Sequence, residues 1–243
     1  TSLRPSALKW FLRFIIQKTC SKVVFVSESV LKSESFSEIK QTVVYNALSD
    51  DFVKSASLTD YEWKDDGVFN VLMICSLKAY KGIYEFVDIA KQCGQYKEIV
   101  FKLVINAEQS EIDLFFVDHD LPLNISINSR QTDLAPFYRQ KSLLVNLSRV
   151  DEWVETFGLT LIEAMAFGIP VIAPPVGGPV EIVTEGVEGF LISSYETEKI
   201  SQKVIELAND KLACLILSKN AKKRCNDFRQ DVFDQEIVSA IND

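Results

Sequence analysis

The chain has 243 residues, of which 47% are hydrophobic and 25% are charged. This is the balance of an ordinary globular protein, with room for one large domain or one domain and part of another. The formal net charge of −8 argues against a nucleic-acid-binding protein, because such proteins carry a basic face. It leaves open a small anionic ligand, which a few N–H groups and one or two cations can bind.

The sequence shows no pattern of a Cys/His zinc site and no transmembrane helix. None of the five cysteines forms a C-x-x-C pair, and His119 is the only histidine, so a Cys/His zinc site is not expected. The cysteines are typical of reduced thiols in a cytosolic protein. No apolar run reaches the roughly 20 residues that a transmembrane helix needs.

The first fifty residues predict a helix at about 6–18, a strand at 23–27, a short helix and a strand at 42–45. The segment 8–18 is basic, aromatic and amphipathic. We favour a helix packed on a neighbouring domain, and the alternative is a helix that lies on a membrane surface. The polar residues 49–67 are typical of a linker.

From residue 68 onward, strands alternate with helices. Strands are predicted at 68–75, 99–105, 125–127, 143–147, 170–173 and 190–192. Helices are predicted at 82–93, 110–116, 133–139, 157–167 and 178–184, and the chain is helical from residue 197. This alternation predicts an α/β fold, a Rossmann-like parallel sheet with helices on both faces. Ligands bind at the carboxyl ends of such strands, which directs attention to the loop 148–156.

Two carboxylates flank the start of the helix that follows this loop. Glu155 ends the loop and Glu163 lies two turns into the helix, while Gly158 allows close backbone approach. Thr156 is expected to cap the helix and to leave its first N–H groups free for a phosphate. The acids are suited to accept hydrogen bonds from sugar hydroxyls, so the pattern favours a nucleotide sugar. Taken alone, however, the pair is more typical of an ordinary surface helix with a capping acid and one exposed glutamate.

The flanking sequence favours the ligand site. The run from Glu155 to Leu191 contains E-x7-E and G-x-P-V-I-A…G-G-x-x-E-I-V…G…G-F-L, and it resembles the C-terminal domain of family 4 retaining glycosyltransferases, which have the GT-B fold. Weaker resemblance extends to residues 26–28, which look like the last strand of the family's N-terminal domain, and to 44–46, which look like the crossing between the domains.

The resemblance implies a role for each matching residue. Glu155 would hold hydroxyls of the donor sugar and Glu163 the nucleotide ribose. Lys81 would stabilise the departing diphosphate, together with backbone N–H groups at the helix start. Arg130 falls where family members hold the base. The remaining implied donor contacts are Ser76, Thr156, Phe157, Gly158, Leu159 and Thr160.

The sequence departs from the family in two respects. Cys75-Ser76 stands where the family often has Gly-Arg, so a bidentate phosphate contact is absent. A GT-B enzyme also needs two Rossmann-like domains. The expected organisation is therefore the tail of an N-terminal domain at 1–50, a linker at 51–67, the donor-binding domain at 68–193 and C-terminal helices at 194–243, with the acceptor site upstream of Thr1.

The function expected from the resemblance is transfer of a sugar, with retention, from a nucleotide-diphosphate sugar to a glycan or lipid-linked acceptor in bacterial surface polysaccharide synthesis. This chain alone is expected to bind nucleotide and to transfer no sugar. One alternative is a non-catalytic nucleotide-sugar-binding or assembly module, which the absent arginine favours. Another is a GT-B-fold epimerase, which the E-x7-E context disfavours.

No cofactor or metal is expected. The segment 118–120, Asp-His-Asp, looks like the Asp-x-Asp metal motif of the other main glycosyltransferase fold, but it lies in a polar loop without the matching architecture. The expected location is cytoplasmic, with peripheral contact at the inner membrane face as the alternative.

Overall fold

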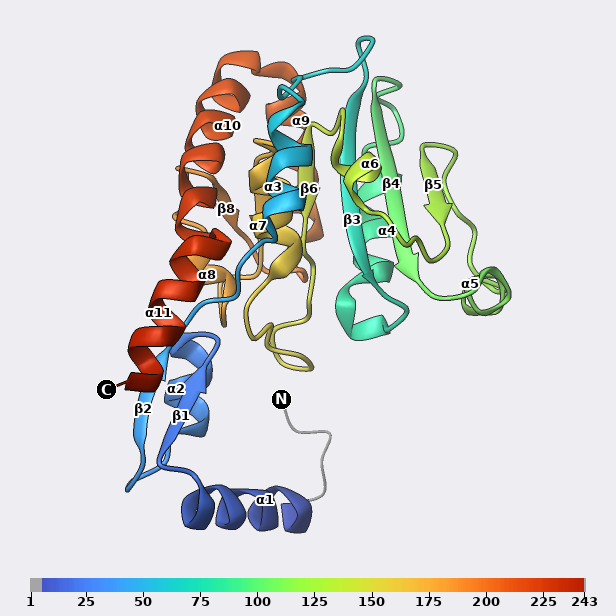
Figure 1. Ribbon diagram of the computed structural model, residues 1–243. Coiled ribbons are helices and arrows are strands. Elements are labelled where there is room, and N and C mark those ends of the chain that lie inside the picture. Colours follow the sequence, from blue (N-terminus) through green and yellow to red (C-terminus); the bar gives the residue numbers. More distant parts are fainter. Residues whose placement is uncertain (1–5, 243) are drawn as a thin grey trace.

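The computed structural model describes residues 6–242 and contains two parallel sheets (Figure 1). The larger sheet has six strands in the order β5-β4-β3-β6-β7-β8. Its strands are β3 (Phe69–Ser76), β4 (Ile99–Asn106), β5 (Ile125–Asn128), β6 (Leu143–Val145), β7 (Val171–Ala173) and β8 (Gly189–Leu191). Every pairing in this sheet is parallel, which confirms the predicted Rossmann-like α/β fold.

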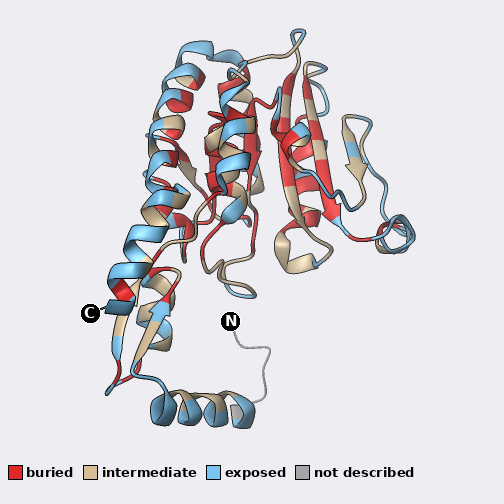
Figure 2. Cartoon of the chain, viewed as in Figure 1, coloured by how far each residue is buried: buried red, intermediate tan, exposed pale blue. Residues whose placement is uncertain are grey.

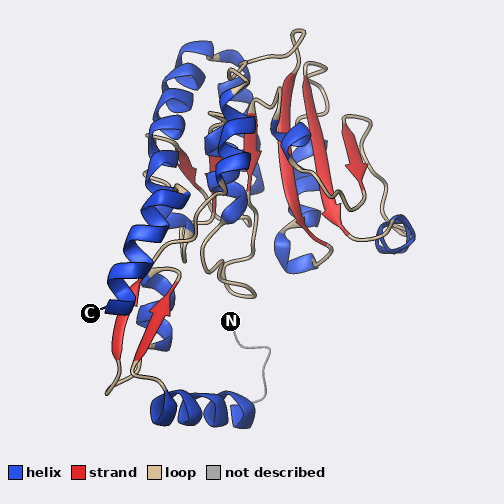
Figure 3. Cartoon of the chain, viewed as in Figure 1, coloured by secondary structure: helices blue, strands red, loops and turns tan. Residues whose placement is uncertain are grey.

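Helices cover both faces of the large sheet (Figure 3). Alternate residues of β3 point to opposite faces, so Val71 and Met73 join one hydrophobic cluster and Leu72 joins the other. The first cluster also contains α4 (Ile83–Gln92), α5 (Gln109–Phe115) and α9 (Thr197–Asn209). The second contains α3 (Asp50–Ser57), α6 (Ala135–Tyr138), α7 (Leu159–Ala166) and α8 (Pro179–Ile182), and α10 (Lys211–Cys225) contributes to both.

Burial explains the apolar composition of the strands. All residues of β6 and β7 are buried, as expected for central strands of a parallel sheet covered on both faces. Figure 2 shows this buried layer between the helices.

A small unit lies apart from the large sheet. It contains α1 (Ser6–Thr19), β1 (Lys22–Phe25), α2 (Glu28–Glu34) and β2 (Lys40–Val43), packed around Phe25, Phe36 and Ile39. The last helix, α11 (Gln230–Asn242), follows the 3₁₀ turn 226–228 and runs from the large sheet to this unit (Figure 1). Lys22 Nζ donates to the carbonyl of Ala240, so the start of β1 is joined to α11.

Three local predictions were wrong. The expected linker contains the helix α3, whose Phe52 packs on the large domain because residues 52, 53 and 56 are apolar on one face. The helix α7 begins at Leu159 rather than 157, and its N-cap is Gly158, so Thr156 does not cap it. The helix α6 is limited to the four residues Ala135–Tyr138, within the predicted range of 133–139.

The first helix presents aromatic side chains to solvent. Lys9 and Arg13 point inward and pair with Glu34 at 2.6 and 3.2 Å, while Trp10 is 68% exposed and stacks on Phe14. Among residues 6–242, no helix is long and apolar enough to cross a bilayer.

Candidate functional site

A cavity of about 240 Å³ lies at the carboxyl edge of the large sheet. The strand order reverses between β3 and β6, because the chain runs outward from β3 to β5 and then returns to β6 on the other side. The loops after β3 and β6 diverge at this point and leave the crevice in which open α/β sheets bind ligands. The cavity is lined by the end of β3, by Lys81, by residues 146–148 and by residues 155–160.

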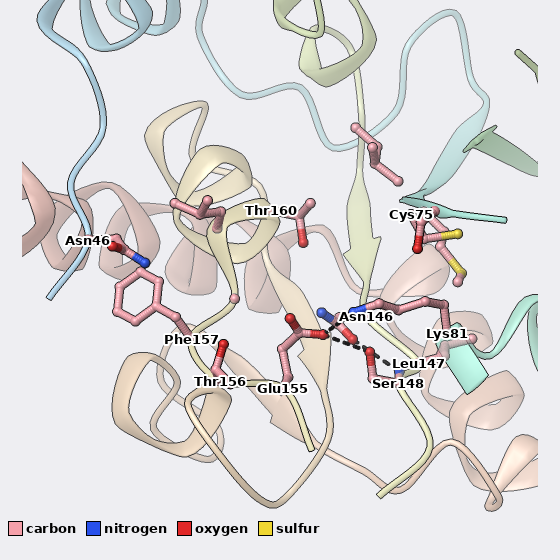
Figure 4. Close-up of a pocket in the computed structure, with 15 residues that line it drawn as sticks. Asn46, Cys75, Lys81, Asn146, Leu147, Ser148, Glu155, Thr156, Phe157 and Thr160 are labelled. Atoms are coloured by element: carbon pink, nitrogen blue, oxygen red, sulfur yellow. Dashed lines mark hydrogen bonds and ion pairs between the residues drawn. The ribbon is translucent and has the colours of Figure 1, made fainter. Parts of the chain in front are cut away.

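A lysine and a glutamate meet across this cavity (Figure 4). Lys81 Nζ lies 2.6 Å from Glu155 Oε2, and Ser148 Oγ donates to the same oxygen at 2.9 Å. The two charged side chains are only 18% and 17% exposed. The pair places one cation and one hydrogen-bond acceptor on the wall of a polar cavity, which fits a ligand that has both anionic groups and hydroxyls.

A glycine brings the two loops together. Gly82 has φ +81° and follows Lys81, and a Cβ at this position would lie 2.1 Å from the carbonyl oxygen of Leu147 at the end of β6. Only glycine fits this approach of two backbones. Lys81 therefore reaches the loop after β6 because its neighbour has no side chain.

The start of α7 faces the cavity without a side-chain cap. Gly158 has φ +120° and ψ 56°, and the next two residues, Leu159 and Thr160, line the cavity. Their N–H groups are the ones a helix N-terminus offers to an anion. Phe157 also lines the cavity, but the residue is only 2% exposed and its ring packs against Tyr45.

Two of the predicted site residues do not line the cavity. Glu163 lies one turn beyond Thr160 on the same face of α7, where its carboxylate accepts a 2.5 Å hydrogen bond from the hydroxyl of Tyr138. Arg130 lies further out, where its Nε donates to Asn106 Oδ1 at 2.8 Å and its guanidinium pairs with an exposed glutamate. Ser76 and Thr156 do line the cavity.

The cysteine at the end of β3 is not a nucleophile in this setting. Burial raises the pKa of Cys75 to about 12, and the nearby Lys81 lowers it by less. A thiol with so high a pKa carries almost no thiolate at neutral pH.

Sequence reasoning missed Asn46, Asn146 and Ser148 as cavity residues. Asn146 and Ser148 belong to the strand end and the loop that the sequence singled out, and Asn146 Oδ1 accepts from the N–H of Ser148 at 3.1 Å. Both are polar residues that come at the end of an apolar strand, and this position could have identified them as cavity residues. Asn46 had none, since it reaches the cavity only through the tertiary fold. In the Asp-His-Asp segment, His119 stacks on Tyr84, and no metal-binding cluster occurs among residues 6–242.

The loop between β6 and α7 is fastened to the turn that carries Lys81. Arg149 pairs with Glu85 of α4 at 2.7 Å, and its N–H donates to the carbonyl of Tyr80 at 2.8 Å. Trp153 stacks on Tyr80 with ring centroids 5.1 Å apart. These contacts hold together the two segments that supply Lys81 and the loop's glutamate.

Replacing Arg149 by Met is expected to lower the free energy of unfolding by about 2–4 kcal/mol, because Glu85 is 8% exposed and would keep a buried charge without its partner. Urea denaturation measures this loss. The double variant Arg149→Met/Glu85→Gln should recover much of it, since the charge is then removed. The matched control is Lys203→Met, which breaks the more exposed pair with Glu206 and should cost less than about 1 kcal/mol. Equal losses in the two single variants would contradict the fastening role.

The fold and the cavity together define an α/β protein whose candidate ligand site lies at the carboxyl edge of a parallel sheet. The family described as "Glycosyl transferases group 1" matches residues 62–224, about two thirds of the chain. The chain belongs to this family.

Two curated relatives illustrate the similarity. An uncharacterized glycosyltransferase of Methanocaldococcus jannaschii is 27% identical over 225 residues, which cover 90% of this chain and 58% of that protein. Sucrose-phosphate synthase of Spinacia oleracea is 35% identical over 112 residues, 46% of this chain and 11% of that protein. The chain therefore spans between about a tenth and about three fifths of these relatives.

Solved structures share the fold. Anabaena HepE in complex with UDP and glucose has a TM-score of 0.80 at 20% identity, over 98% of this chain and 67% of that one. A glycosyltransferase of Rickettsia africae has a TM-score of 0.79 at 20% identity, with the same two coverages. At this identity the likeness shows the fold.

Proposed function

We propose that the chain is the donor-binding half of a retaining family 4 glycosyltransferase that transfers a hexose from a nucleotide-diphosphate sugar to a glycan or lipid-linked acceptor. The observation that carries the proposal is the Lys81–Glu155 pair in a polar cavity beside the uncapped start of α7. The pair supplies a cation for a diphosphate and an acceptor for sugar hydroxyls. The helix start supplies N–H groups for the phosphate oxygens.

In the proposed reaction, the bond between the sugar's anomeric carbon and the diphosphate oxygen breaks, and the acceptor oxygen bonds to the same carbon on the same face. The acceptor's proton passes to the departing diphosphate. Lys81 and the N–H groups of residues 159 and 160 stabilise the negative charge that develops on the leaving group. Glu155 orients the sugar through its hydroxyls. Protein groups carry this charge, so the proposal requires no metal or cofactor.

The nucleotide of the donor contacts the remaining polar side chains at the sheet edge. Glu163 binds the ribose, Arg130 lies toward the base, and Ser76 donates to a phosphate oxygen in place of the family's arginine. UDP and glucose are bound by the structurally similar Anabaena protein, so UDP-glucose is the first donor to test.

A second domain completes the proposed enzyme and provides the acceptor site. The small unit of residues 6–43 has a two-stranded parallel sheet, and parallel sheets are normally covered on both faces. Trp10 and Phe11 of α1 are 68% and 52% exposed, as expected for a helix that another domain covers. We place the enzyme in bacterial surface polysaccharide synthesis, in the cytoplasm or at the inner membrane face.

A thermal-shift panel of UDP, GDP, ADP and dTDP sugars tests the proposal. At least one donor should raise the melting temperature, and Glu163→Ala should abolish most of that shift. Glu198→Ala on α9 is the control, because this exposed residue lies on the opposite face of the sheet and should leave the shift intact. Binding of none of the four, or binding that Glu163→Ala leaves unchanged, would count against the site.

The second candidate is a non-catalytic nucleotide-sugar-binding or assembly module, which Ser76 in place of arginine favours. The two candidates differ at Glu155. A catalytic donor site should bind UDP-glucose more tightly than UDP and should lose this preference in Glu155→Ala, whereas a module that holds only the nucleotide should bind the two equally well both in the wild type and in the variant. The chain alone is expected to bind a donor without transferring its sugar, and turnover with a purified donor and acceptor would overturn that expectation.

A further inference from the structure

A buried tyrosine supports the glutamate of α7. Tyr138 is 0% exposed, its ring stacks on Phe167 at 5.6 Å, and Phe52 meets it edge-on at 5.9 Å. The ring is thus held by α3 and α7 together. Its hydroxyl points out of this aromatic cluster and donates to Glu163 Oε2 at 2.5 Å.

The hydrogen bond leaves half of the carboxylate free. Among residues 6–242, no residue donates to Glu163 Oε1, and no lysine or arginine pairs with Glu163. A neutral phenol is therefore the group that orients this carboxylate. The short, charge-assisted bond fixes one oxygen and leaves the other to accept hydrogen bonds from a ligand.

The tyrosine also belongs to the segment on which the nucleotide base is proposed to lie. It ends α6, the short helix that follows residues 130–133, and the N–H of Ala135 donates to Asp133 Oδ1 at 3.0 Å. The hydrogen bond from Tyr138 of α6 to Glu163 of α7 therefore connects the segment that follows β5 with the Glu163 carboxylate. A rotation of Glu163 away from the sheet edge would leave a buried hydroxyl without a partner, which is costly.

We propose that Tyr138 is a positioning residue for nucleotide recognition: its hydroxyl holds the Glu163 carboxylate in the orientation that receives the ribose hydroxyls. The inference rests on the proposed function, because it assumes that Glu163 faces a ribose. It goes further by assigning the orientation of that acid to a residue that does not touch the ligand.

The same bond affects the protonation of Glu163. Burial raises the pKa of this carboxyl, and the hydrogen bond from Tyr138 opposes that rise. Other titratable groups on the elements packed around it face elsewhere: Arg139 donates to Ser55 of α3, and Cys225 of α10 donates to the carbonyl of Ile162. Tyr138 is thus the neighbour whose hydrogen bond lowers the pKa of Glu163 against the effect of burial and so favours its ionised form.

The sign of the pH effect follows from this. An ionised Glu163 accepts hydrogen bonds from both ribose hydroxyls, so affinity falls as the pH drops through its pKa. Removing the tyrosine hydroxyl raises that pKa further. The fall in affinity should therefore begin at a higher pH in a variant that lacks the hydroxyl.

The test is Tyr138→Phe, which keeps the ring in its aromatic cluster. Calorimetric titration with UDP from pH 5 to 8 should show affinity about fivefold to tenfold weaker at neutral pH and an acid midpoint shifted upward. The preference for UDP over its 2′,3′-dideoxy analogue should shrink, because the ribose acceptor is no longer oriented. A tyrosine needed only for packing would change neither the midpoint nor this preference.

Two further variants make the outcome decisive. Tyr61→Phe removes another tyrosine hydroxyl, which is part-buried and donates to the carbonyl of Ser142 at the opposite end of the sheet, and it should leave UDP binding unchanged. Glu163→Gln should remove the acid midpoint. If the wild-type chain does not bind UDP, the proposed donor site fails for this nucleotide. If it binds UDP and Tyr138→Phe alters neither the midpoint nor the dideoxy preference, the positioning role alone is overturned.

Discussion

Lys81→Met is expected to weaken binding of UDP by about 30-fold to 100-fold, the equivalent of about 2–3 kcal/mol. Two effects act in the same direction. The variant loses the cation that would neutralise the diphosphate, and it leaves Glu155 without its 2.6 Å partner. The unpaired carboxylate then repels the phosphates in a cavity where both side chains are more than four-fifths buried. Calorimetric titration with UDP measures the loss.

A double variant separates the two effects. Lys81→Met/Glu155→Gln removes the repulsion and should recover part of the affinity, whereas Glu155→Gln alone should change UDP binding little and weaken selection of UDP-glucose over UDP. Lys91→Met, an exposed lysine of α4, is the matched control and should have no effect. If Lys81→Met and Lys91→Met bind UDP equally well, Lys81 is not the phosphate cation.

Gly82→Ala is expected to lower the free energy of unfolding by about 3 kcal/mol or more. The residue has φ +81°, which costs an alanine about 1–2 kcal/mol. The added Cβ would also meet the carbonyl oxygen of Leu147 at 2.1 Å, and backbone atoms cannot move aside as a flexible side chain can. Relief requires the Lys81 turn to separate from β6, so UDP affinity should fall as well. Urea denaturation and calorimetry measure the two effects.

Gly67→Ala is the control that measures the cost of the positive φ by itself, without a steric clash of the added Cβ. Gly67 has nearly the same φ, +82°, but a Cβ there meets nothing within 4 Å. We expect it to cost about 1–2 kcal/mol and to leave UDP affinity unchanged. The difference between the two losses in free energy of unfolding measures the cost of the clash with Leu147. Equal costs would mean that the two loops can separate without harm.

These predictions concern segments that are distant in the sequence. Lys81 and Glu155 are 74 residues apart and meet because β3 and β6 are neighbours in the sheet. The strand order that makes them neighbours also opens the cavity between their loops. Arg149 and Gly82 then set how closely the loops approach.

The strands and the loop that borders the cavity could be predicted from the sequence because their signals are local. Buried parallel strands are apolar along their length, and β6 and β7 show this directly. The loop after β6 was singled out by the rule that ligands bind at carboxyl ends of strands. Where a local signal was ambiguous, prediction failed: the segment containing α3 is polar on its exposed face, and its one apolar face has meaning only against the large sheet.

The sequence by itself determined the alternation of strands and helices and the family signature from Glu155 to Leu191. Each of these depends on residues near one another in the chain. Only the tertiary structure decided that Lys81 pairs with Glu155, that Glu163 takes its hydrogen bond from Tyr138, and that α11 returns to the first strands. Those contacts join segments 25 to 218 residues apart, and the packing of the sheet and its helices, rather than any local pattern, brings them together.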